Sequence, residues 1–271
     1  MPDTSFITPS PHDLPPRVRV LTTTRFPAVR PELVEGQAAF PGGLQQIQEI
    51  WPPTAHAKGA AIEAAFVQRG QPLQHFLPSP PLWLEQVHGI DVAKMNRSPD
   101  VVAIRQAPPV ADAAVTDAPN VVLALLTADC LPVVIADENS AALAVVHAGW
   151  RSLAGGVLEN TVRHLACPAA LLMAWLGPAI GPAAFEVGED VHVAFDAPHD
   201  AEAAACFVPT GVAGKWHADL YALARLRLRR LGVPKISGGT WCTYSDARRF
   251  FSWRRGRDEG RMATFAFLAE P

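Results

Sequence analysis

The sequence predicts an α/β fold in a single domain that follows a short N-terminal arm. Three observations support this prediction: apolar runs of strand composition recur along the chain, helix-like segments lie between some of them, and no break in composition divides the 271 residues. A chain of this length can bury a large core as one domain. We therefore expect residues 18–271 to fold together, and residues 1–17, which are rich in Pro, Ser and Asp, to form a flexible arm.

The first third of the chain predicts a strand, a loop and a helix. The alternating β-branched residues of RVRVLTTTR indicate a strand that ends near Arg25. Residues 26–43 are rich in Pro and Gly and show little periodicity, so we expect an insertion-like surface loop there. A helix-like segment, AKGAAIEAAFVQRG, follows. PLWLEQVHGIDVAKM then predicts two strands folded back at His88 and Gly89, with the glycine supplying the permissive backbone of the turn.

Three apolar runs in the middle of the chain have strand composition. They are VVLALLT, PVVIAD and AALAVVHAGW, all within residues 121–150. The turn-forming residues Glu138, Asn139 and Ser140 join the last two runs, which predicts a hairpin inside a sheet. We expect a helix to follow over LAGGVLENTVRHLA.

The C-terminal third predicts a strand at ALLMAWLG and then one clear amphipathic helix, DLYALARLRLRRLG, ending at Gly232. KISGGTWCTY, RRFFSWRR and MATFAFLA predict a strand-rich end of the domain. The apolar face of the helix consists of Leu220, Leu223, Ala224, Leu228 and Leu231.

The composition argues against several classes of partner. The net charge is −3, so no positive excess is present to attract nucleic acid or an anionic membrane. The N-terminal segment lacks the basic and then apolar pattern of a secretory signal, so we expect a cytoplasmic protein. Pro or charged residues interrupt the long apolar runs, so we expect no membrane-spanning segment. The four cysteines form no Cys-x-x-Cys pair, which signals neither a disulfide framework nor a local zinc knuckle.

Four residues that can carry chemistry lie where the predicted strands end. Asp129 and Cys130 follow one apolar run, His147 ends another, and His88 lies on the predicted turn. The hairpin can return His147 to Cys130, and two imidazoles with one thiolate make a zinc set that leaves a fourth position open. The long spacings do not by themselves specify a metal. The same residues also fit a cysteine hydrolase, with Cys130 as nucleophile and His147 as base, or a purely structural zinc.

Six motifs together resemble a known family. EQVHG, TADCLPV, HAGWR, LGPAIGP with FEVG, CTYS and FFSWRR occur in the order of the laccase-domain or polyphenol oxidase (multicopper oxidase-like) family, which is associated with zinc-dependent purine nucleoside phosphorylase activity. The resemblance covers roughly residue 80 to the C-terminus. It implies zinc bound by His88, Cys130 and His147, in a single α/β domain whose mixed β-sheets are flanked by helices.

The resemblance also implies substrates and activities. Inosine, adenosine and methylthioadenosine would be cleaved by phosphate to a free base and a ribose 1-phosphate product, and adenosine would also be deaminated. Hydrolytic editing of a cell-wall precursor, by a cysteine-type or a zinc hydrolase, is an alternative role associated with the family. Copper is an alternative occupant of the zinc site, with weak polyphenol oxidase activity. The nine histidines include no His-x-His pair, so a true multicopper mechanism is not expected. The sequence is compatible with a monomer or a homodimer.

The family motifs also supply candidate site residues. Asp129, Cys130 and His147 are the catalytic candidates, since Asp129 could orient a ligand histidine or shuttle a proton. Arginine binds phosphate through its planar fork, which favours the arginines of the motifs. The chain departs from the family pattern after Arg25, at Ser152 and at Trp253. The candidates for substrate and phosphate binding are Arg25, Arg151, Arg254, Thr127, Glu186, Thr243 and Ser252, with Arg255, Arg261 and the aromatic Trp150 as weaker ones.

Overall fold

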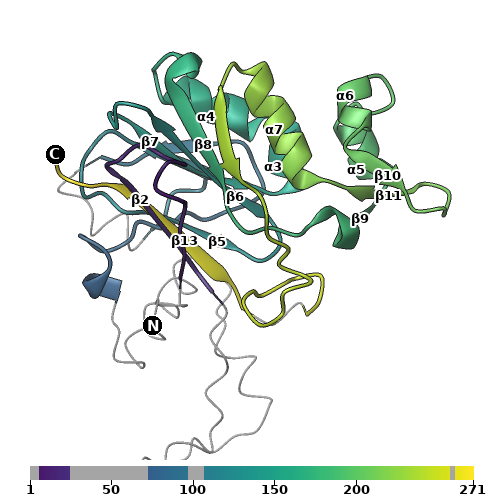
Figure 1. Ribbon diagram of the computed structural model, residues 1–271, viewed down its shortest axis with the longest axis horizontal. Helices are drawn as coiled ribbons and strands as arrows, with labels where there is room; N and C mark the ends of the chain where they lie inside the picture. The colour runs from purple at the N-terminus through teal and green to yellow at the C-terminus, as the bar shows by residue number, and fades with distance from the viewer. Residues whose placement is uncertain (1–5, 25–72, 97–106, 257–259) are drawn as a thin grey trace, which may run out of the picture.

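The computed structural model describes residues 6–24, 73–96, 107–256 and 260–271. These residues form three β-sheets and five α-helices arranged in layers (Figure 1). The prediction of an α/β fold with mixed sheets flanked by helices is therefore confirmed. The predicted loop 26–43 and the helix predicted near residues 57–70 lie outside the described residues. No helix in the described part of the chain has the length and apolar character needed to cross a membrane.

A six-stranded mixed sheet forms the centre of the molecule, with the order β12-β8-β6-β7-β4-β3. β6 and β7 pair antiparallel, with Val134 opposite Val145, so the predicted hairpin is confirmed. The outer pairs β12/β8 and β4/β3 are parallel, and the remaining pairs are antiparallel. The strands are β3 (Val92–Lys94), β4 (Ala113–Thr116), β6 (Leu131–Asp137), β7 (Leu143–Ala148), β8 (Leu172–Leu176) and β12 (Lys235–Gly238).

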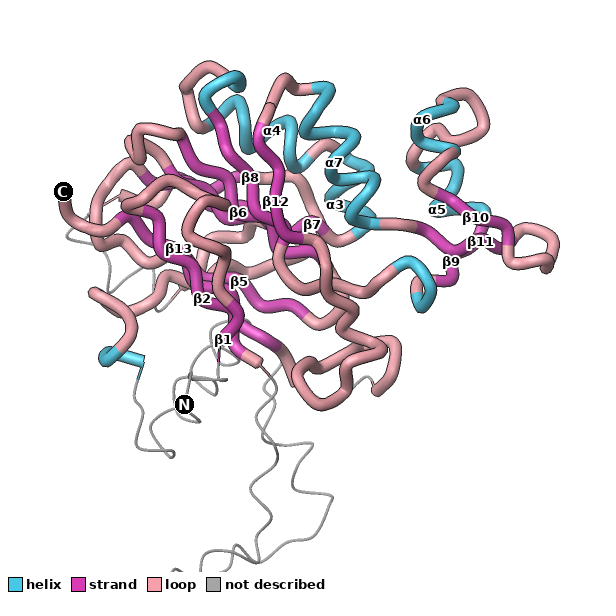
Figure 2. The backbone as a smooth tube through the Cα atoms, viewed as in Figure 1, coloured by secondary structure: helices cyan, strands magenta, loops and turns pink. Residues whose placement is uncertain are grey.

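A four-stranded antiparallel sheet, with the order β1-β2-β13-β5, packs against the central sheet (Figure 2). In this sheet β2, from the N-terminal part of the chain, pairs with β13, from the C-terminal part. Phe6 and Ile7 pair with β2, and Leu14 is buried. Part of the segment expected to be a flexible arm is thus attached to the sheet. The strands are β1 (Phe6–Ile7), β2 (Val18–Thr23), β5 (Leu123–Thr127) and β13 (Met262–Leu268).

The inner strands of the central sheet are buried on both faces: every residue of β4, β6 and β7 is buried, and successive side chains of a strand point to opposite sides. In β6, Val133 and Ile135 pack with the helices, whereas Val134 and Ala136 pack with the four-stranded sheet. Each buried valine or isoleucine side chain stabilises the fold by about 1.5–3 kcal/mol. The helices that pack with Val133 and Ile135 on this face of the central sheet are α3 (Trp150–Gly155), α4 (Val157–His164) and α7 (Leu220–Arg230).

A small three-stranded sheet with two short helices extends to one side of these layers (Figure 1). Its strand order is β10-β11-β9, and both pairs are antiparallel. The elements are β9 (Glu186–Gly188), β10 (Phe207–Pro209), β11 (Lys215–Ala218), α5 (Glu189–Ala194) and α6 (Ala201–Ala204).

The two predicted helices that fall within the described residues differ in outcome. α7 forms as expected: Asp219 caps it by accepting from the N–H of Ala222, its apolar face is buried except for the partly buried Leu231, and Gly232 follows it with a φ of 87°. The helix expected over residues 153–166 is instead two helices, α3 and α4. Gly156, with a φ of 100°, separates them because this left-handed backbone ends a helix.

Two predicted strand regions are wrong. Before His88 the chain makes only isolated bridges, from Leu82 and Glu85, and β3 pairs in parallel with β4 instead of folding back on that segment. The left-handed residue of the turn is His88, with a φ of 60°, and not the glycine after it. Residues 248–255 contain turns and no strand, because Arg255 donates to the carbonyls of neighbouring loops and bends the chain.

Candidate active site

A cavity of about 460 Å³ opens where the chain passes from one sheet to the other. β5 ends at Thr127 in the four-stranded sheet, and β6 begins at Leu131 in the central sheet. Asp129 makes the crossing with a φ of 85°, a left-handed conformation that non-glycine residues rarely adopt. Because Leu131 pairs with Ala148, the start of β6 lies beside the end of β7. The pairing therefore brings Cys130 next to His147.

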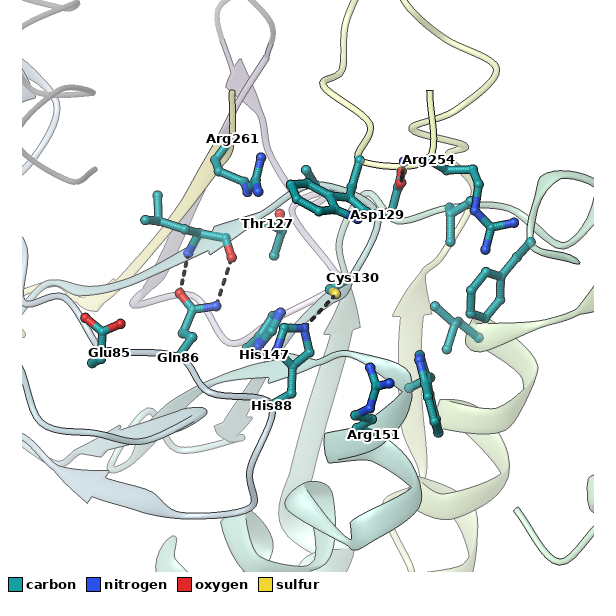
Figure 3. A pocket seen from close by; sticks show the side chains of 17 residues that line it. Glu85, Gln86, His88, Thr127, Asp129, Cys130, His147, Arg151, Arg254 and Arg261 are labelled. Atoms are coloured by element: carbon teal, nitrogen blue, oxygen red, sulfur yellow. Dashed lines mark hydrogen bonds between the residues drawn. The ribbon is translucent and has the colours of Figure 1, made fainter. Parts of the chain in front are cut away.

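The structure brings together the three predicted metal ligands, His88, Cys130 and His147 (Figure 3). One donor atom from each lies within 4.8 Å of the others, and Nε2 of His88 is 3.7 Å from Sγ of Cys130. Zinc bonds of about 2.0–2.3 Å place the donors of a tetrahedral site roughly 3.3–3.8 Å apart. The donor set therefore fits zinc with only small side-chain adjustments. It is the one potential metal-binding group of this kind within the described ranges.

Asp112, which none of the motifs singled out, contacts both histidines. It lies just before β4 and is fully buried, and its Oδ1 lies 2.7 Å from Nδ1 of His147. Its carboxylate also accepts from the backbone N–H groups of Val87, His88 and Gly89. The only signal in the sequence is an acid inside the apolar stretch PVADAAV, since a buried carboxylate needs partners.

The three ligand side chains and Asp112 form a coupled group of charges. Burial opposes ionisation of Cys130, but the adjacent His147 and His88 hold its pKa below the ordinary value. Burial likewise disfavours the charged form of His147, but Cys130 and Asp112 raise the pKa of its imidazole. The pKa of Asp112 is lowered despite burial, by the hydrogen bond and charge of His147 and by the backbone N–H groups. Without metal, the geometry thus favours a thiolate beside an imidazolium.

Asp129 does not contact the ligand histidines but ties the C-terminal loops to the cavity. Its carboxylate accepts from the Thr243 hydroxyl at 2.6 Å, the Ser252 hydroxyl at 2.9 Å and the backbone N–H of Arg254 at 2.7 Å. The orienting contact considered for Asp129 is made by Asp112 instead. Thr243 and Ser252, predicted to bind substrate, are buried and point their hydroxyls at Asp129.

Among the described residues, three arginines line the cavity, each beside an aromatic ring. The guanidinium of Arg151 lies 4.3 Å from the ring centroid of Trp150. Arg254 lies 5.7 Å from the Phe185 ring and donates to the backbone carbonyl of Glu186. Arg261 lies 4.9 Å from the Trp253 ring. These rings pack against the guanidinium groups and help to hold the three side chains in place.

The other predicted candidates have different surroundings. Thr127 lines the cavity with its hydroxyl buried, and this hydroxyl finds no hydrogen-bond partner in the described part of the chain. Glu186 contributes its backbone carbonyl to Arg254, and its side chain is not part of the lining. Arg255 donates to three backbone carbonyls and so has a structural role. Arg25 lies outside the described residues.

Gln86 fixes the segment that carries His88 against β5. Its side-chain amide donates to the carbonyl of Leu126 and accepts from the N–H of the same residue, both at 2.8 Å (Figure 3). The side chain thus makes the two hydrogen bonds that the backbone of a neighbouring strand would otherwise make with Leu126. This contact was not predicted, because no local pattern shows that a glutamine will pair with a strand 40 residues away.

The fold and the site define an α/β protein in which three side chains that could bind a metal ion lie in a cavity lined by arginines. The chain belongs to the family described as multi-copper polyphenol oxidoreductase laccase, which it matches over residues 65–269.

Relatives with curated names support this assignment. A protein of Xylella fastidiosa named purine nucleoside phosphorylase is 53% identical over 194 residues, which cover 71% of this chain and 74% of the relative. The Escherichia coli protein named purine nucleoside phosphorylase YfiH is 50% identical over 192 residues, covering 71% and 75%. A solved structure from Neisseria meningitidis is 39% identical, with a TM-score of 0.76 over 98% of this chain and 100% of that one.

Proposed function

We propose that the protein is a zinc-dependent purine nucleoside phosphorylase. It would cleave inosine, adenosine and methylthioadenosine with phosphate, releasing the base and a ribose 1-phosphate product, and would also deaminate adenosine. Support comes from the relatives named purine nucleoside phosphorylase and from the composition of the cavity. We place this activity in the cytoplasm, where a free thiol such as Cys130 stays reduced.

The observation that carries the proposal is the presence of the ligand cluster and three arginines in one cavity. Ligand pockets of about 300–1,000 Å³ hold small molecules, and about 460 Å³ is suited to a nucleoside. Phosphorolysis requires an anion site within reach of the glycosidic bond. Arg151 on one side of the cavity and Arg254 on the other can supply it, since a guanidinium binds phosphate through two N–H groups.

The chain's own residues have distinct roles in this proposal. His88, Cys130 and His147 would hold the zinc, and Thr127, whose hydroxyl has no hydrogen-bond partner among the described residues, would offer this hydroxyl to the substrate. Asp129 acts through Thr243 and Ser252 by keeping the loop of Arg254 at the cavity. Glu186 acts in the same way through its carbonyl. A bound zinc ion supplies Lewis-acid stabilisation of negative charge and lowers the pKa of water, which suits deamination.

The test is the dependence of nucleoside cleavage on phosphate. Purified protein would be incubated with inosine or adenosine, with and without inorganic phosphate, and the products separated. We expect a ribose 1-phosphate product and free base only when phosphate is present, and some inosine from adenosine in either case. Release of the base at the same rate with and without phosphate, or no cleavage of any of the three nucleosides, would contradict the proposal.

A cysteine hydrolase that edits a cell-wall precursor is the second candidate. The observation that favours it is that Cys130 lies beside His147 and has a lowered pKa. Both are properties of an activated cysteine nucleophile. The two candidates differ in their need for metal, because Cys130 cannot serve as a zinc ligand and a free nucleophile at once. Activity that survives complete removal of metal but is lost on alkylation would favour the hydrolase.

Copper fits the same three ligands but not a multicopper mechanism. Divalent copper binds nitrogen and sulfur ligands more tightly than zinc does, so a copper-loaded protein with weak polyphenol oxidase activity is consistent with the site. A multicopper centre needs several clustered imidazoles, and the described residues provide one cluster with two. Zinc therefore remains the proposed native metal. The sequence is compatible with either a monomer or a homodimer as the active form.

A further inference from the structure

The carboxylate of Asp112 lies within hydrogen-bond distance of four nitrogen atoms. Its Oδ1 lies 2.7 Å from Nδ1 of His147 and accepts from the backbone N–H of His88 at 3.0 Å. Its Oδ2 accepts from the backbone N–H groups of Val87 at 3.1 Å and Gly89 at 2.6 Å. The side chain is fully buried, so these contacts replace its water shell. A single residue outside the ligand set thus reaches two ligands from different parts of the fold.

The turn that carries His88 depends on this carboxylate. His88 has a φ of 60°, a left-handed conformation that strains the backbone of a non-glycine residue. Three successive backbone N–H groups of the turn point at Asp112, and these bonds offset the strain. The backbone of Asp112 is also fixed, because its carbonyl accepts from the N–H of His147 at 2.7 Å. The turn and β7 are therefore held in one geometry.

We propose that Asp112 is a positioning residue that places both ligand histidines and selects the tautomer of His147 that can bind metal. Backbone N–H groups can only donate, so both oxygens at position 112 must accept. An ionised carboxylate also requires the proton of His147 to lie on Nδ1, which leaves Nε2 free to face the cluster. The inference rests on the metal centre of the proposed function but not on the substrate.

The substitution Asp112→Asn tests this directly because it preserves the shape and changes only the donor pattern. An amide N–H₂ in place of Oδ2 would face the N–H groups of Val87 and Gly89. These contacts would then contain only hydrogen-bond donors and no acceptor. In place of Oδ1 it would face the N–H of His88 and donate to Nδ1 of His147. The ring proton would then move to Nε2, where it blocks coordination. Neither orientation of the amide preserves the site.

Zinc affinity, measured by competition with a chromophoric chelator, is the first readout. Loss of such a partner of a metal-bound histidine typically weakens metal binding by about 10–100-fold, and we expect this range for Asp112→Asn. Asp137→Asn is the matched control, since Asp137 is also buried and accepts a backbone N–H from Ala141, at the opposite end of the β6-β7 hairpin. Unchanged affinity in Asp112→Asn, or an equal loss in the control, would overturn the inference.

The histidine nitrogen-15 NMR spectrum of zinc-loaded wild type is the second readout and does not require the variant to fold. We expect His147 to bind zinc through Nε2 and to carry a hydrogen-bonded proton on Nδ1. Coordination through Nδ1 would overturn the role of Asp112. Wild-type protein that takes up no zinc would overturn the metal centre and this role together. Protein that binds zinc as described but cleaves no nucleoside would refute the phosphorylase proposal alone.

Discussion

Gly149→Ala should weaken metal binding without straining the backbone at the substituted position. Gly149 has a φ of −61° and a ψ of 157°, an extended conformation that alanine adopts readily. A Cβ atom at this position would lie 2.9 Å from Cδ2 of His88 and 3.1 Å from Sγ of Cys130, closer than such atoms normally approach. The added methyl group would therefore press on two of the three ligands.

The size of the effect follows from the cost of overpacking. One additional methyl group in a packed site costs about 1–3 kcal/mol. If the ligands move to relieve the overlap, this cost appears in metal binding. At about 1.4 kcal/mol per factor of ten, it corresponds to zinc affinity reduced by roughly 5- to 150-fold. A smaller loss of stability, separate from metal binding, comes from alanine replacing glycine at the helix N-cap.

The assay is a zinc competition titration of wild type, Gly149→Ala and the control Gly155→Ala. A Cβ atom at Gly155 meets Cγ2 of Ile90 at 2.9 Å, an equal overlap with an exposed side chain that can turn away. We expect Gly155→Ala to bind zinc as wild type does. Equal zinc affinity in Gly149→Ala and wild type would show that the end of β7 does not close directly on the ligands.

Two further predictions concern charge at the site. Arg254→Met should raise the KM for phosphate while zinc content stays constant, whereas Arg230→Met, which removes an exposed ion pair with Asp200, should leave both unchanged; an unaltered phosphate dependence in Arg254→Met would assign Arg254 a structural role. In metal-free protein, Cys130 should alkylate with a midpoint near pH 6 because its pKa is lowered to about 6 and the thiolate dominates above that pH. Cys206, whose pKa burial raises to about 11, should remain unreacted at pH 7, and a Cys130 midpoint near pH 9 would contradict the geometry.

The elements that the sequence predicts well are those with a local pattern. The 3.6-residue period of α7, with its Asp219 cap and terminal Gly232, is complete within 14 residues. The β6-β7 hairpin is likewise specified by two apolar runs and a short turn. By contrast, β13 pairs with β2 across about 240 residues and also with β5, which places two neighbouring apolar runs, β5 and β6, in different sheets. No local signal contains that information.

The site shows the same division between local and long-range information. His88, Cys130 and His147 are identifiable because each lies in a motif, but their convergence depends on the crossing at Asp129 and on the pairing of β6 with β7. Asp112 has no motif, and its role depends on contacts 23–35 residues away in the chain. The segment 248–255 is strand-like in composition, but the contacts of its arginines bend it into turns.

We propose that Cys130 acts as a metal ligand in a zinc-dependent enzyme. The most direct measurement is elemental analysis of wild type and Cys130→Ser, coupled to cleavage of inosine with phosphate. We expect about one zinc per wild-type chain, and a parallel fall of zinc content and cleavage in the variant because a hydroxyl binds zinc weakly at neutral pH, with partial recovery in excess zinc. Full activity in wild-type protein from which all metal has been removed, together with an inactive Cys130→Ser that excess zinc does not restore, would contradict the account.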